Sequence, residues 1–585
     1  MVTFFDATPS RIPGAAARQR PTGGRPAASI PALGARPMDA RAAQGFRPLR
    51  RPLPTWIALA FIASAAPASA AVLPVTSCAD DGSPGTLRSV VATAASGDTV
   101  DLAMLGCTAI TLTGGDIEVA ADDLAIAGPG RHALTIDAAG ASRVFLHHGI
   151  GTLDVRAVTI SGGRVVGSHG GCISAENGSV RLVDARVTGC TAEGSVDQAF
   201  YPWGGAIFAV GDITLERSTA EDNLVTSDNA SRLLGGALAT WRVGEDFGDI
   251  TLIDSVVSGN RVVSNDTATG DAEGGGVATA SSGTVTVLRS TLRDNSVQSA
   301  SNDPYFTSLT AGGAISAFDL RIEQGTISGN SVVSVDARFN TGGGGIVVTG
   351  AADIIDSTID NNQCNVTGGG LMHNGAIQGV SRLDIVNSTF ANNHAGVAFG
   401  AIMVGAATTI HNSTIAFNSA PGAPPLHPAH PAGPPPPFDP PSGVGGVWFS
   451  PLDPTGTLQI ESSIIAANAV DGNSPNGDDL AAPEFEPIDV AGSHNLIGDT
   501  TNMILPGDTL VGDPHLSPLA DNGGPTQTLA LATASPAIDA GSNTDGLVHD
   551  QRGAWFVRTS GGATDIGAFE DQPPPDVIFV GNFDG

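Results

Sequence analysis

Adjacent aspartates are the first residues in this sequence whose type and spacing could do chemistry. Three such pairs occur: Asp80-Asp81, Asp122-Asp123 and Asp478-Asp479. Two carboxyl groups flanking one glycosidic bond are the usual machinery of sugar hydrolysis. Neighbouring residues of a β-strand point to opposite faces, however, so adjacent aspartates rarely converge on one bond. We therefore interpret all three pairs as turn residues.

Four arginines are the candidates for a base that removes a proton from an acidic sugar, and three of them directly precede or lie within a short β-rich run. They are Arg217, Arg289, Arg321 and Arg382. Ordinary solvent-facing strand residues would have the same placement. Lysine does not occur in the chain, and neither does the Gly-His-Gly element of polygalacturonase-like hydrolases. We expect no catalytic residues; a polysaccharide lyase or glycoside hydrolase is the alternative.

Metal ligands form no recognisable pattern. No Cys/His spacing is typical of zinc, and the histidines are scattered apart from His147-His148. Clustered aspartates leave calcium open as a ligand, although no Asp-x-Asp-x-Asp-Gly loop occurs. We therefore predict neither a metal site nor a cofactor, with calcium as the one ion to consider.

Aromatic residues gather in segments of variable length, 194–203 and 296–311, which hold both tyrosines of the chain. Segment 331–341 adds polar residues and one more ring. The residues predicted to bind a ligand are Tyr201, Trp203, Tyr305, Phe306, Asp336 and Phe339. Rings with nearby carboxylates suit sugar stacking or protein contact. The alternative is that these rings pack against the neighbouring loop.

A repeated unit must position these segments. Alternating β-rich runs are followed by a hexamer of the form Ser-Thr-Ile-Ser-Gly-Asn, and glycine clusters such as Gly204-Gly205-Ala206-Ile207 precede the runs. The hexamers end at Asn223, Asn260, Asn295, Asn330, Asn362, Asn393, Asn418 and Asn468. The variable segments fall between a hexamer and the next glycine cluster. This placement predicts that they project from one side of the molecule.

This repeat predicts an all-β fold, a right-handed parallel β-helix with three short strands in each coil. One coil cannot bury its apolar side chains, whereas stacked coils pair each strand with its copies and close a common core. The first seven hexamer asparagines should form a structural ladder of side-chain amides, and asparagine also tolerates the left-handed backbone conformation that we expect there. A β-propeller also repeats at about 40 residues, but the shrinking period favours a solenoid.

Composition divides the chain. Residues 1–70 are an N-terminal extension with an export signal, in which an apolar run precedes Ala68-Ser69-Ala70; Met1 and Met38 are alternative starts. Residues 71–479 are the predicted β-helix, with a proline-rich loop at 420–442. Residues 480–572 should form the last coils and a cap that hides the terminal sheet edge. Residues 573–585 are a C-terminal tail.

The net charge restricts the partners that the protein could bind, and the cysteines bear on the compartment in which it matures. The formal net charge of −31 argues against binding to nucleic acid or to anionic membranes. After removal of the signal, no apolar run is long enough for an integral membrane domain. Export makes disulfides feasible. Cys78 could then pair with Cys107, and Cys172 with Cys190, which lies about one coil further on; Cys364 is left over.

Sequence motifs at both ends resemble those of bacterial choice-of-anchor Q proteins, a group of exported parallel β-helices. The glycine-cluster and hexamer repeats themselves resemble those of polymorphic outer-membrane proteins and pectate-lyase-like β-helices. The N-terminal motifs are Cys78-Ala-Asp-Asp81, Gly85-Thr-Leu-Arg88 and Ile110-Thr-Leu-Thr113. The C-terminal motifs are Asp521-Asn-Gly-Gly-Pro-Thr526, Ser535-Pro-Ala-Ile-Asp-Ala-Gly541, Asp550-Gln-Arg-Gly553 and Asp565-Ile-Gly-Ala-Phe-Glu570. The resemblance covers nearly all of residues 72–585 and implies a secreted or outer-surface protein, but no common activity. We expect an adhesin-like or structural protein that binds glycan or protein.

Overall fold

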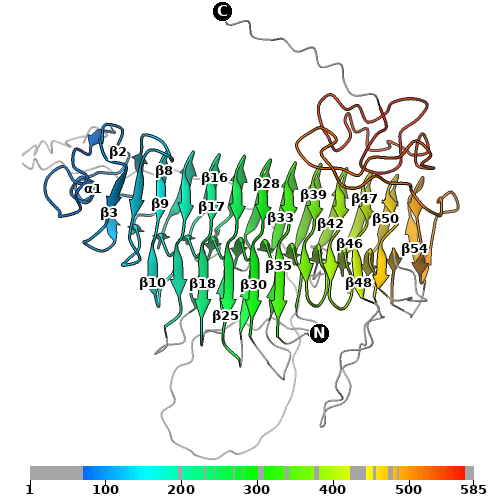
Figure 1. Cartoon of the computed structure of the whole chain (residues 1–585), viewed down its shortest axis with the longest axis horizontal. Helices are drawn as coiled ribbons and strands as arrows, with labels where there is room; N and C mark the ends of the chain where they lie inside the picture. Colours follow the sequence, from blue (N-terminus) through cyan, green and yellow to red (C-terminus); the bar gives the residue numbers. More distant parts are fainter. Residues whose placement is uncertain are drawn as a thin grey trace, which may run out of the picture. The chain divides into compact units, whose positions relative to one another are not determined.

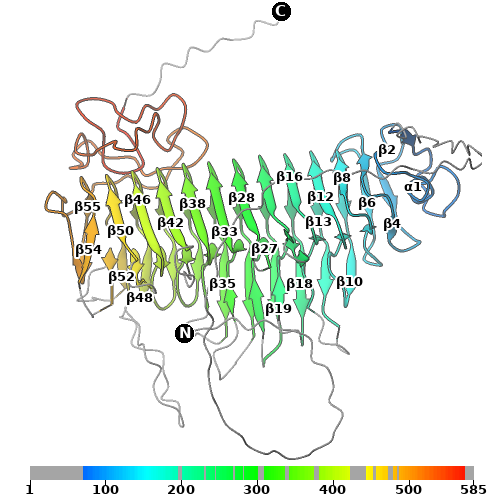
Figure 2. The same cartoon turned by 180° about the vertical axis from the view of Figure 1, so that it is seen from behind.

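Short parallel strands return at each turn of the chain and pair with their copies in the next coil (Figures 1 and 2). The computed structural model describes residues 70–195, 201–229, 232–243, 246–267, 270–280, 282–300, 309–335, 341–373, 381–421, 443–451, 456–471, 479–483 and 487–572. The chain divides into two units, Met1–Ala66 and Pro67–Gly585, and all described residues belong to the second. Its coils confirm the predicted parallel β-helix.

Three parallel sheets run through the helix. Sheet 1 contains β1 (Val72–Pro74), β2 (Asp98–Asp101), β5 (Leu124–Ala127), β8 (Thr152–Arg156), β12 (Ser179–Val183), β16 (Ile213–Glu216), β23 (Ile250–Ile253), β28 (Thr284–Leu288), β33 (Asp319–Glu323), β38 (Ala351–Ile355), β42 (Arg382–Val386), β46 (Ala407–His411), β50 (Leu458–Glu461), β54 (Ile488–Ala491) and β57 (Met503–Ile504). Sheet 2 contains β3 (Ala109–Thr111), β6 (Thr135–Asp137), β9 (Thr159–Ser161), β13 (Arg186–Thr188), β17 (Thr219–Glu221), β24 (Val256–Ser258), β29 (Thr291–Arg293), β34 (Thr326–Ser328), β39 (Thr358–Asp360), β43 (Thr389–Ala391), β47 (Thr414–Ala416), β51 (Ile464–Ile465) and β55 (Leu496–Ile497). Sheet 3 contains β4 (Ile117–Val119), β7 (Phe145–His147), β11 (Ile173–Ala175), β15 (Ile207–Ala209), β20 (Leu238–Thr240), β27 (Val277–Thr279), β32 (Ile315–Ala317), β37 (Ile346–Val348), β41 (Leu371–His373), β45 (Ile402–Val404), β49 (Val447–Phe449), β53 (Leu480–Ala481) and β56 (Thr500–Thr501).

Further strands lie outside the expected three per coil. Sheet 4 contains β10 (Arg164–Val166), β14 (Thr191–Glu193), β18 (Leu224–Ser227), β25 (Arg261–Ser264), β30 (Ser296–Ser299), β35 (Ser331–Ser334), β40 (Gln363–Cys364), β44 (His394–Ala395), β48 (Ser419–Pro421) and β52 (Ala469–Asp471). Sheet 5 contains β19 (Arg232–Leu234), β26 (Asp271–Glu273), β31 (Thr310–Ala311) and β36 (Thr341–Gly342). The run after each hexamer also alternates, and it buries Val225, Val262 and Val297 in a second apolar cluster. The prediction of three strands was therefore incomplete for the middle coils.

Insertions leave the coil at more than one turn. The antiparallel hairpin of β21 (Arg242–Val243) and β22 (Asp246–Phe247) lies between β20 of sheet 3 and β23 of sheet 1. It does not lie between a hexamer and a glycine cluster, so the expectation that all variable segments project from one side was wrong. The glycine-cluster turn is only the commonest insertion point.

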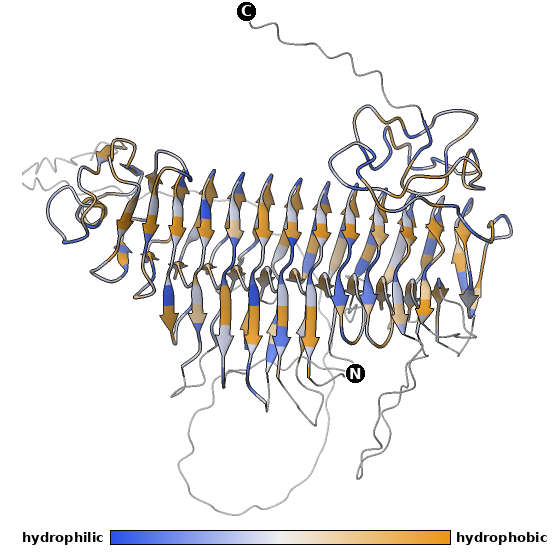
Figure 3. Cartoon of the chain, viewed as in Figure 1, coloured by the Kyte–Doolittle hydropathy of each residue, from blue (hydrophilic) through white to orange (hydrophobic). Residues whose placement is uncertain are grey.

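Strand alternation builds the core. In β8, Leu153 and Val155 are fully buried while Thr152 and Asp154 are partly exposed, and the register repeats this pattern on β12 and β16. Figure 3 shows hydrophobic and hydrophilic bands alternating along the stacked strands. Each inward residue thus lies between its copies in adjacent coils, which is where burial of apolar surface stabilises the stack.

The hexamer asparagines form one buried column. Asn223 Nδ2 donates to Asn260 Oδ1 at 2.9 Å, and the same contact recurs coil by coil to Asn418, whose Nδ2 donates to Asn468 Oδ1 at 2.8 Å. Each amide oxygen also accepts the backbone N–H of the preceding asparagine, as Asn260 Oδ1 does from Asn223 at 3.0 Å. Because both groups are buried, the ladder fixes the coil spacing while leaving few polar atoms unsatisfied.

We expected the left-handed backbone conformation at the hexamer asparagines, but it occurs one residue earlier in the chain. The residues with positive φ directly precede the ladder, for example Asp222 (56°), Asp294 (57°) and Asn361 (54°), whereas the ladder asparagines have negative φ. Glycine fills the same position at Gly259 and Gly329. The residue before the asparagine makes the turn, and its turn directs the asparagine amide inward.

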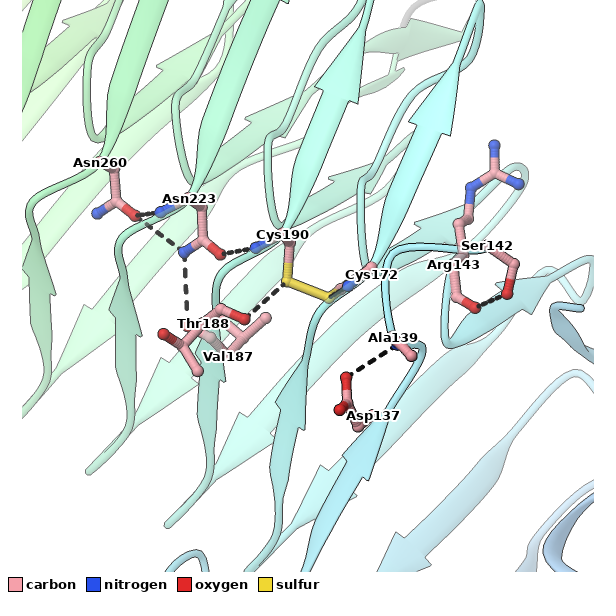
Figure 4. Close-up of a disulfide and its surroundings, with 11 residues drawn as sticks. Asp137, Ala139, Ser142, Arg143, Cys172, Val187, Thr188, Cys190, Asn223 and Asn260 are labelled. Atoms are coloured by element: carbon pink, nitrogen blue, oxygen red, sulfur yellow. Dashed lines mark hydrogen bonds between the residues drawn. A yellow bond between two sulfur atoms is a disulfide. The ribbon is translucent and has the colours of Figure 1, made fainter. Parts of the chain in front are cut away.

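Different chemistry closes the two ends of the ladder. At the first end, the backbone N–H of Cys190 donates to Asn223 Oδ1 at 3.0 Å, and Cys190 forms a disulfide with Cys172 (Figure 4). At the other end, Asp479 Oδ1 accepts both Asn468 Nδ2 and Asn468 N at 2.9 Å. A carboxylate suits the last position because it accepts hydrogen bonds and has no N–H group that would need a further acceptor.

A second ladder, which the sequence analysis did not anticipate, follows the hexamer serines. Ser218 N donates to Ser255 Oγ at 3.1 Å, and Ser255 N donates to Ser290 Oγ at 2.9 Å. The pattern resumes from Gly325 N through Ser357 to Asn495. The serine that begins seven of the eight hexamers was the available signal; Gly325 begins the other one.

The N-terminal motif closes the first coils. The helix α1 (Leu87–Val91) begins at Thr86, whose hydroxyl accepts the N–H of Ser89. Arg88 contacts both carboxylate oxygens of Asp80 at 2.9 Å and donates to the carbonyl groups of Gly115 and Asp116. This clamp ties three segments together at the first coil, which has no neighbouring coil on one side among the described residues.

The C-terminal module, residues 505–572, lies along the side of the helix (Figures 1 and 2). Its contacts are with turns and strands of sheet 2: Thr358 Oγ1 donates to Gln527 O at 2.6 Å, and Ala568 N donates to Thr414 Oγ1 at 2.9 Å. Leu529 packs against Ala391 and Ala416. We expected a cap over the terminal edge; the module instead covers the outer face of β39, β43, β47 and β51.

Both predicted disulfides are confirmed. Cys78 is bonded to Cys107 and Cys172 to Cys190, whereas Cys364 is free and buried. Two disulfides indicate maturation in an oxidising compartment, periplasmic or extracellular. No helix in the part of the chain that the structure describes is long and apolar enough to cross a membrane.

Thiol titration provides a direct check on this assignment. Burial raises the pKa of Cys364 to about 12, so its unreactive thiol should escape a disulfide reagent in the native protein. Denatured protein should yield one thiol, and denatured reduced protein five. Replacing both Cys172 and Cys190 with serine should lower the free energy of unfolding by about 3 kcal/mol. Three thiols before reduction would contradict the pairing.

Candidate functional site

The structure describes two of the six residues predicted to bind a ligand. Tyr201 is 40% exposed, whereas Trp203 is 6% exposed. Tyr305, Phe306, Asp336 and Phe339 lie outside the described residues. The ring of Trp203 therefore packs within the protein, as in the alternative to ligand binding given above. Tyr201 is the described residue of this set whose side chain reaches solvent.

Trp203 belongs to an aromatic cluster of four residues, His169, Trp203, Phe208 and Trp241, hereafter the Trp203 cluster. The ring centroids of Trp203 and Trp241 are 4.3 Å apart, those of Trp203 and His169 5.0 Å, and those of His169 and Phe208 4.4 Å. Such spacings are typical of stacked aromatic pairs. Trp203 and Phe208 are buried, whereas His169 and Trp241 are half-buried, so the cluster has two partly exposed rings beside two buried ones.

A sharp corner in the coil places the cluster on the outer face of sheet 3. Trp203 pairs in parallel with Leu234, and the turn between Trp203 and β15 uses Gly204 at φ 66°. A Cβ on Gly204 would lie 2.1 Å from the carbonyl oxygen of Ile207, so no other residue fits. The corner folds Trp203 against Phe208, the outward residue of β15.

His169 is the one residue of the Trp203 cluster that could carry a charge, and its surroundings keep it neutral. Burial, helped by the nearby positive charge of Arg143, lowers the pKa of His169 to about 4. The imidazole is therefore neutral at physiological pH and behaves as an aromatic ring. Trp203 Nε1 is buried without a hydrogen-bond acceptor among the described residues. The cluster is suited to holding a flat apolar face rigidly, not to acid–base chemistry.

Sequence reasoning found Tyr201 and Trp203 but missed His169, Phe208 and Trp241. The missed residues lie at the centre of a sheet 3 strand or beside one. Other coils carry small residues at the register position of Phe208, namely Ala239, Ala278 and Ser316. A large ring beside coils with small side chains at this position was the signal that comparison of neighbouring repeats would have revealed, although Met372, Met403 and Trp448 occupy the same column further along.

One group of acids and arginines gathers on the outer face of sheet 1. The guanidinium of Arg382 contacts the carboxylates of Asp353 and Asp384, and Thr409 donates to Asp384. Asp353 and Asp384 are register partners on β38 and β42. Strands in this relation are about 4.8 Å apart, a separation that would suit two carboxyl groups acting on one glycosidic bond.

The pairing of these carboxylates favours a structural role. A hydrolase needs one protonated carboxyl group, whereas both carboxyl groups here contact the same guanidinium, as in a structural ion-pair network. The other candidate arginines are also paired: Arg217 with Asp184 at 2.9 Å, Arg289 with Asp254 at 2.8 Å and Arg321 with Glu323 at 2.6 Å. Arg217 and Arg289 lie in left-handed turns, at φ 49° and 48°. Recurring ion pairs between adjacent coils stabilise the stack.

The aspartates of the three adjacent pairs lie in turns, as expected, or at the end of the asparagine ladder. Burial opposes ionisation of Asp80, but hydrogen bonds from Arg88 and from the backbone of Thr113 and Gly114 outweigh it and hold its pKa below the usual value. Asp122 and Asp123 accept backbone N–H groups of Ile150 and Thr152. Asp479 ends the asparagine ladder, and Asp478 lies outside the described residues.

Among the residues that the structure describes, no group of three or more His, Cys, Asp or Glu side chains could hold a metal ion. A separate cavity of about 650 Å³ lies between the last coils and the C-terminal module, lined in part by Asp479, Asp499, Asp513 and His515. No protein-family model, curated protein or solved structure matches this chain.

Proposed function

We propose that this chain is an exported, non-catalytic β-helix that binds glycan through Tyr201 and Trp241, held by the rest of the Trp203 cluster. The observation that carries the proposal is the packing of the half-buried rings of Trp241 and His169 against the buried ring of Trp203, with the exposed Tyr201 two residues before Trp203 in the chain. Aromatic side chains immobilised in this way present a flat face at little entropic cost. Sugar rings bind such faces through their C–H groups.

The rest of the molecule supports a scaffold. The hallmark residues of the N-terminal and C-terminal motifs form internal contacts: Arg88 clamps Asp80, and Arg552 pairs with Asp550 while its guanidinium lies between the rings of Phe556 and Phe569. The candidate acids and arginines pair with one another. A long rod built in this way can hold a binding surface at a distance from its point of attachment.

A glycan array with the full chain tests the proposal. Replacing Tyr201 and Trp241 together with alanine should weaken binding about tenfold or more, because two stacking surfaces are lost. Trp555→Ala is the matched control, since Trp555 is 80% exposed and lies in the C-terminal module. Binding that is unchanged in the double variant, or equally reduced in the control, would rule out this surface. Binding of proteins but not of glycans would assign it to a protein ligand.

An assay for cleavage of polysaccharides distinguishes a non-catalytic scaffold from an enzyme. The chain is incubated with a panel of acidic polysaccharides, with and without calcium, and unsaturated products and new reducing ends are followed. We expect neither. If products form and Asp384→Asn abolishes them, the Arg382 group is a catalytic site and the non-catalytic assignment is wrong.

A further inference from the structure

Asp356 lies at the boundary between the coils and the C-terminal module. Its carboxylate accepts Asn387 Nδ2 at 2.6 Å, and the same amide donates to His549 O of the module at 3.3 Å. Thr526 Oγ1 of the module donates to the backbone oxygen of Asp356 at 3.2 Å. The carboxyl group is thus enclosed by two coils and by the module.

The charges around this carboxyl group are mostly negative. Glu323 faces it from the end of β33, Asp550 and His549 face it from the module, and the neighbouring turn residue Asn387 is neutral. Burial is the main cause that raises the pKa of Asp356 to about 6, and the two acids add to it. The docked module therefore favours the protonated form of Asp356.

The aspartate at the same turn of a coil that the module does not cover has a lowered pKa, not a raised one. Asp254 has the same left-handed conformation, at φ 49° against 50° for Asp356. Its partner is Arg289, whose hydrogen bonds hold the pKa of Asp254 below its usual value. Two differences therefore separate Asp356 from Asp254: its partner in the next coil is the neutral Asn387 and not an arginine, and the module covers it.

A second titratable contact crosses the boundary. His411 Nδ1, at the end of β46, lies 2.6 Å from Asp545 Oδ2 of the module. Glu461 is the register neighbour of His411 on β50, so both charged groups near the imidazole are acidic. This contact is an ion pair only while the imidazole is protonated.

We infer that the C-terminal module is a pH-responsive latch, which binds the outer face of sheet 2 most tightly in acid and loosens as the enclosed Asp356 loses its proton. Its release would uncover Thr358, Thr389 and Thr414, whose hydroxyl groups now contact the module. The surface beneath it would then become accessible in one range of pH only.

The direction of the pH effect follows from the protonation of Asp356 when the module is docked and when it is free. Below about pH 4, Asp356 is protonated whether the module is docked or free, so docking carries no penalty. Between about pH 4 and pH 6 the free form ionises while the docked form keeps its proton, and docking weakens progressively. Above pH 6 the effect has its full size, for which a shift of about two pKa units sets an upper bound of a factor of about 100 in the docking equilibrium.

Hydrogen exchange of the full chain at pH 5 and pH 8, corrected for the intrinsic exchange rates, tests the latch. Amides of residues 505–572 should lose about tenfold or more of their protection at pH 8 relative to those of the coils. Asp356→Asn mimics the protonated carboxyl group and should reduce this difference, whereas Asp254→Asn in the uncovered coil should not. Protection of the coils in each variant verifies that the helix is folded.

Two results would overturn the latch. One is equal relative protection of the module at both pH values in the unmodified chain, a measurement that needs no variant. The other is a pH dependence in Asp356→Asn that matches the unmodified chain, because the titrating group would then be elsewhere in the module. Glu570 is such a group: burial raises its pKa to about 7, but it lies inside the module.

Discussion

Asn295→Ala should lower the free energy of unfolding by about 3–5 kcal/mol. Asn295 Oδ1 accepts both the backbone N–H and the Nδ2 group of Asn260, at 3.1 and 2.9 Å, and Asn295 Nδ2 donates to Asn330 Oδ1 at 3.0 Å. All three asparagines are fully buried. Alanine would leave two donors of Asn260 without that acceptor, and each such group costs about 1–3 kcal/mol, whereas Asn330 Oδ1 would keep the backbone N–H of residue 295 at 2.9 Å.

Chemical denaturation and hydrogen exchange measure this effect. In a stacked repeat each coil contacts only its neighbours, so the loss of protection should centre on the coils that contain Asn260 and Asn330. Asp294→Asn is the control, because Asp294 is exposed and asparagine tolerates its left-handed conformation. A change below 1 kcal/mol in Asn295→Ala would mean that apolar packing alone sets the coil spacing.

Ala416→Glu should release the C-terminal module while the coils stay folded. Ala416 is fully buried because Leu529 of the module packs over it. The same column of sheet 2 carries Glu221 and Arg293 in uncovered coils. The coil therefore accommodates a charge at this position, and the cost of several kcal/mol for burying an unpaired carboxylate falls on the module contact.

Limited proteolysis provides the measurement. We expect new cleavage within residues 505–572 of Ala416→Glu, together with an unchanged thermal transition of the coils. Arg293→Glu, at the equivalent uncovered position, should be cleaved like the unmodified chain. A module that stays resistant in Ala416→Glu would show that its hydrogen bonds, such as that of Gln551 Nε2 to Thr358 Oγ1 at 2.8 Å, suffice for docking. Loss of the coil transition as well would show that module and coils form one folding unit.

Local sequence determined the coil. Strand alternation, the glycine clusters and the hexamers act between residues that are close in sequence or repeated at one period, and stacking follows because a single coil cannot bury its apolar face. The column of Asn223 to Asn418 was foreseen for this reason. The position of its left-handed residue was not, because asparagine and aspartate both tolerate that conformation and only the backbone distinguishes Asp222 from Asn223.

Contacts between segments distant in sequence were decided by the tertiary structure alone. Nothing local indicates that Gln551 meets Thr389, 162 residues away, or that a module at the C-terminal end covers the side of the helix and not its edge. The candidate site divides in the same way. Its aromatic composition marked Tyr201 and Trp203 in advance, but the corner at Gly204 decided which ring is buried, because it folds the chain back on Phe208. Sequence by itself thus determined the coil, its ladder and both disulfides, since period and residue type are enough for these. Only the tertiary structure decided which outward faces of the coil are covered, since covering depends on how separate parts of the chain pack together.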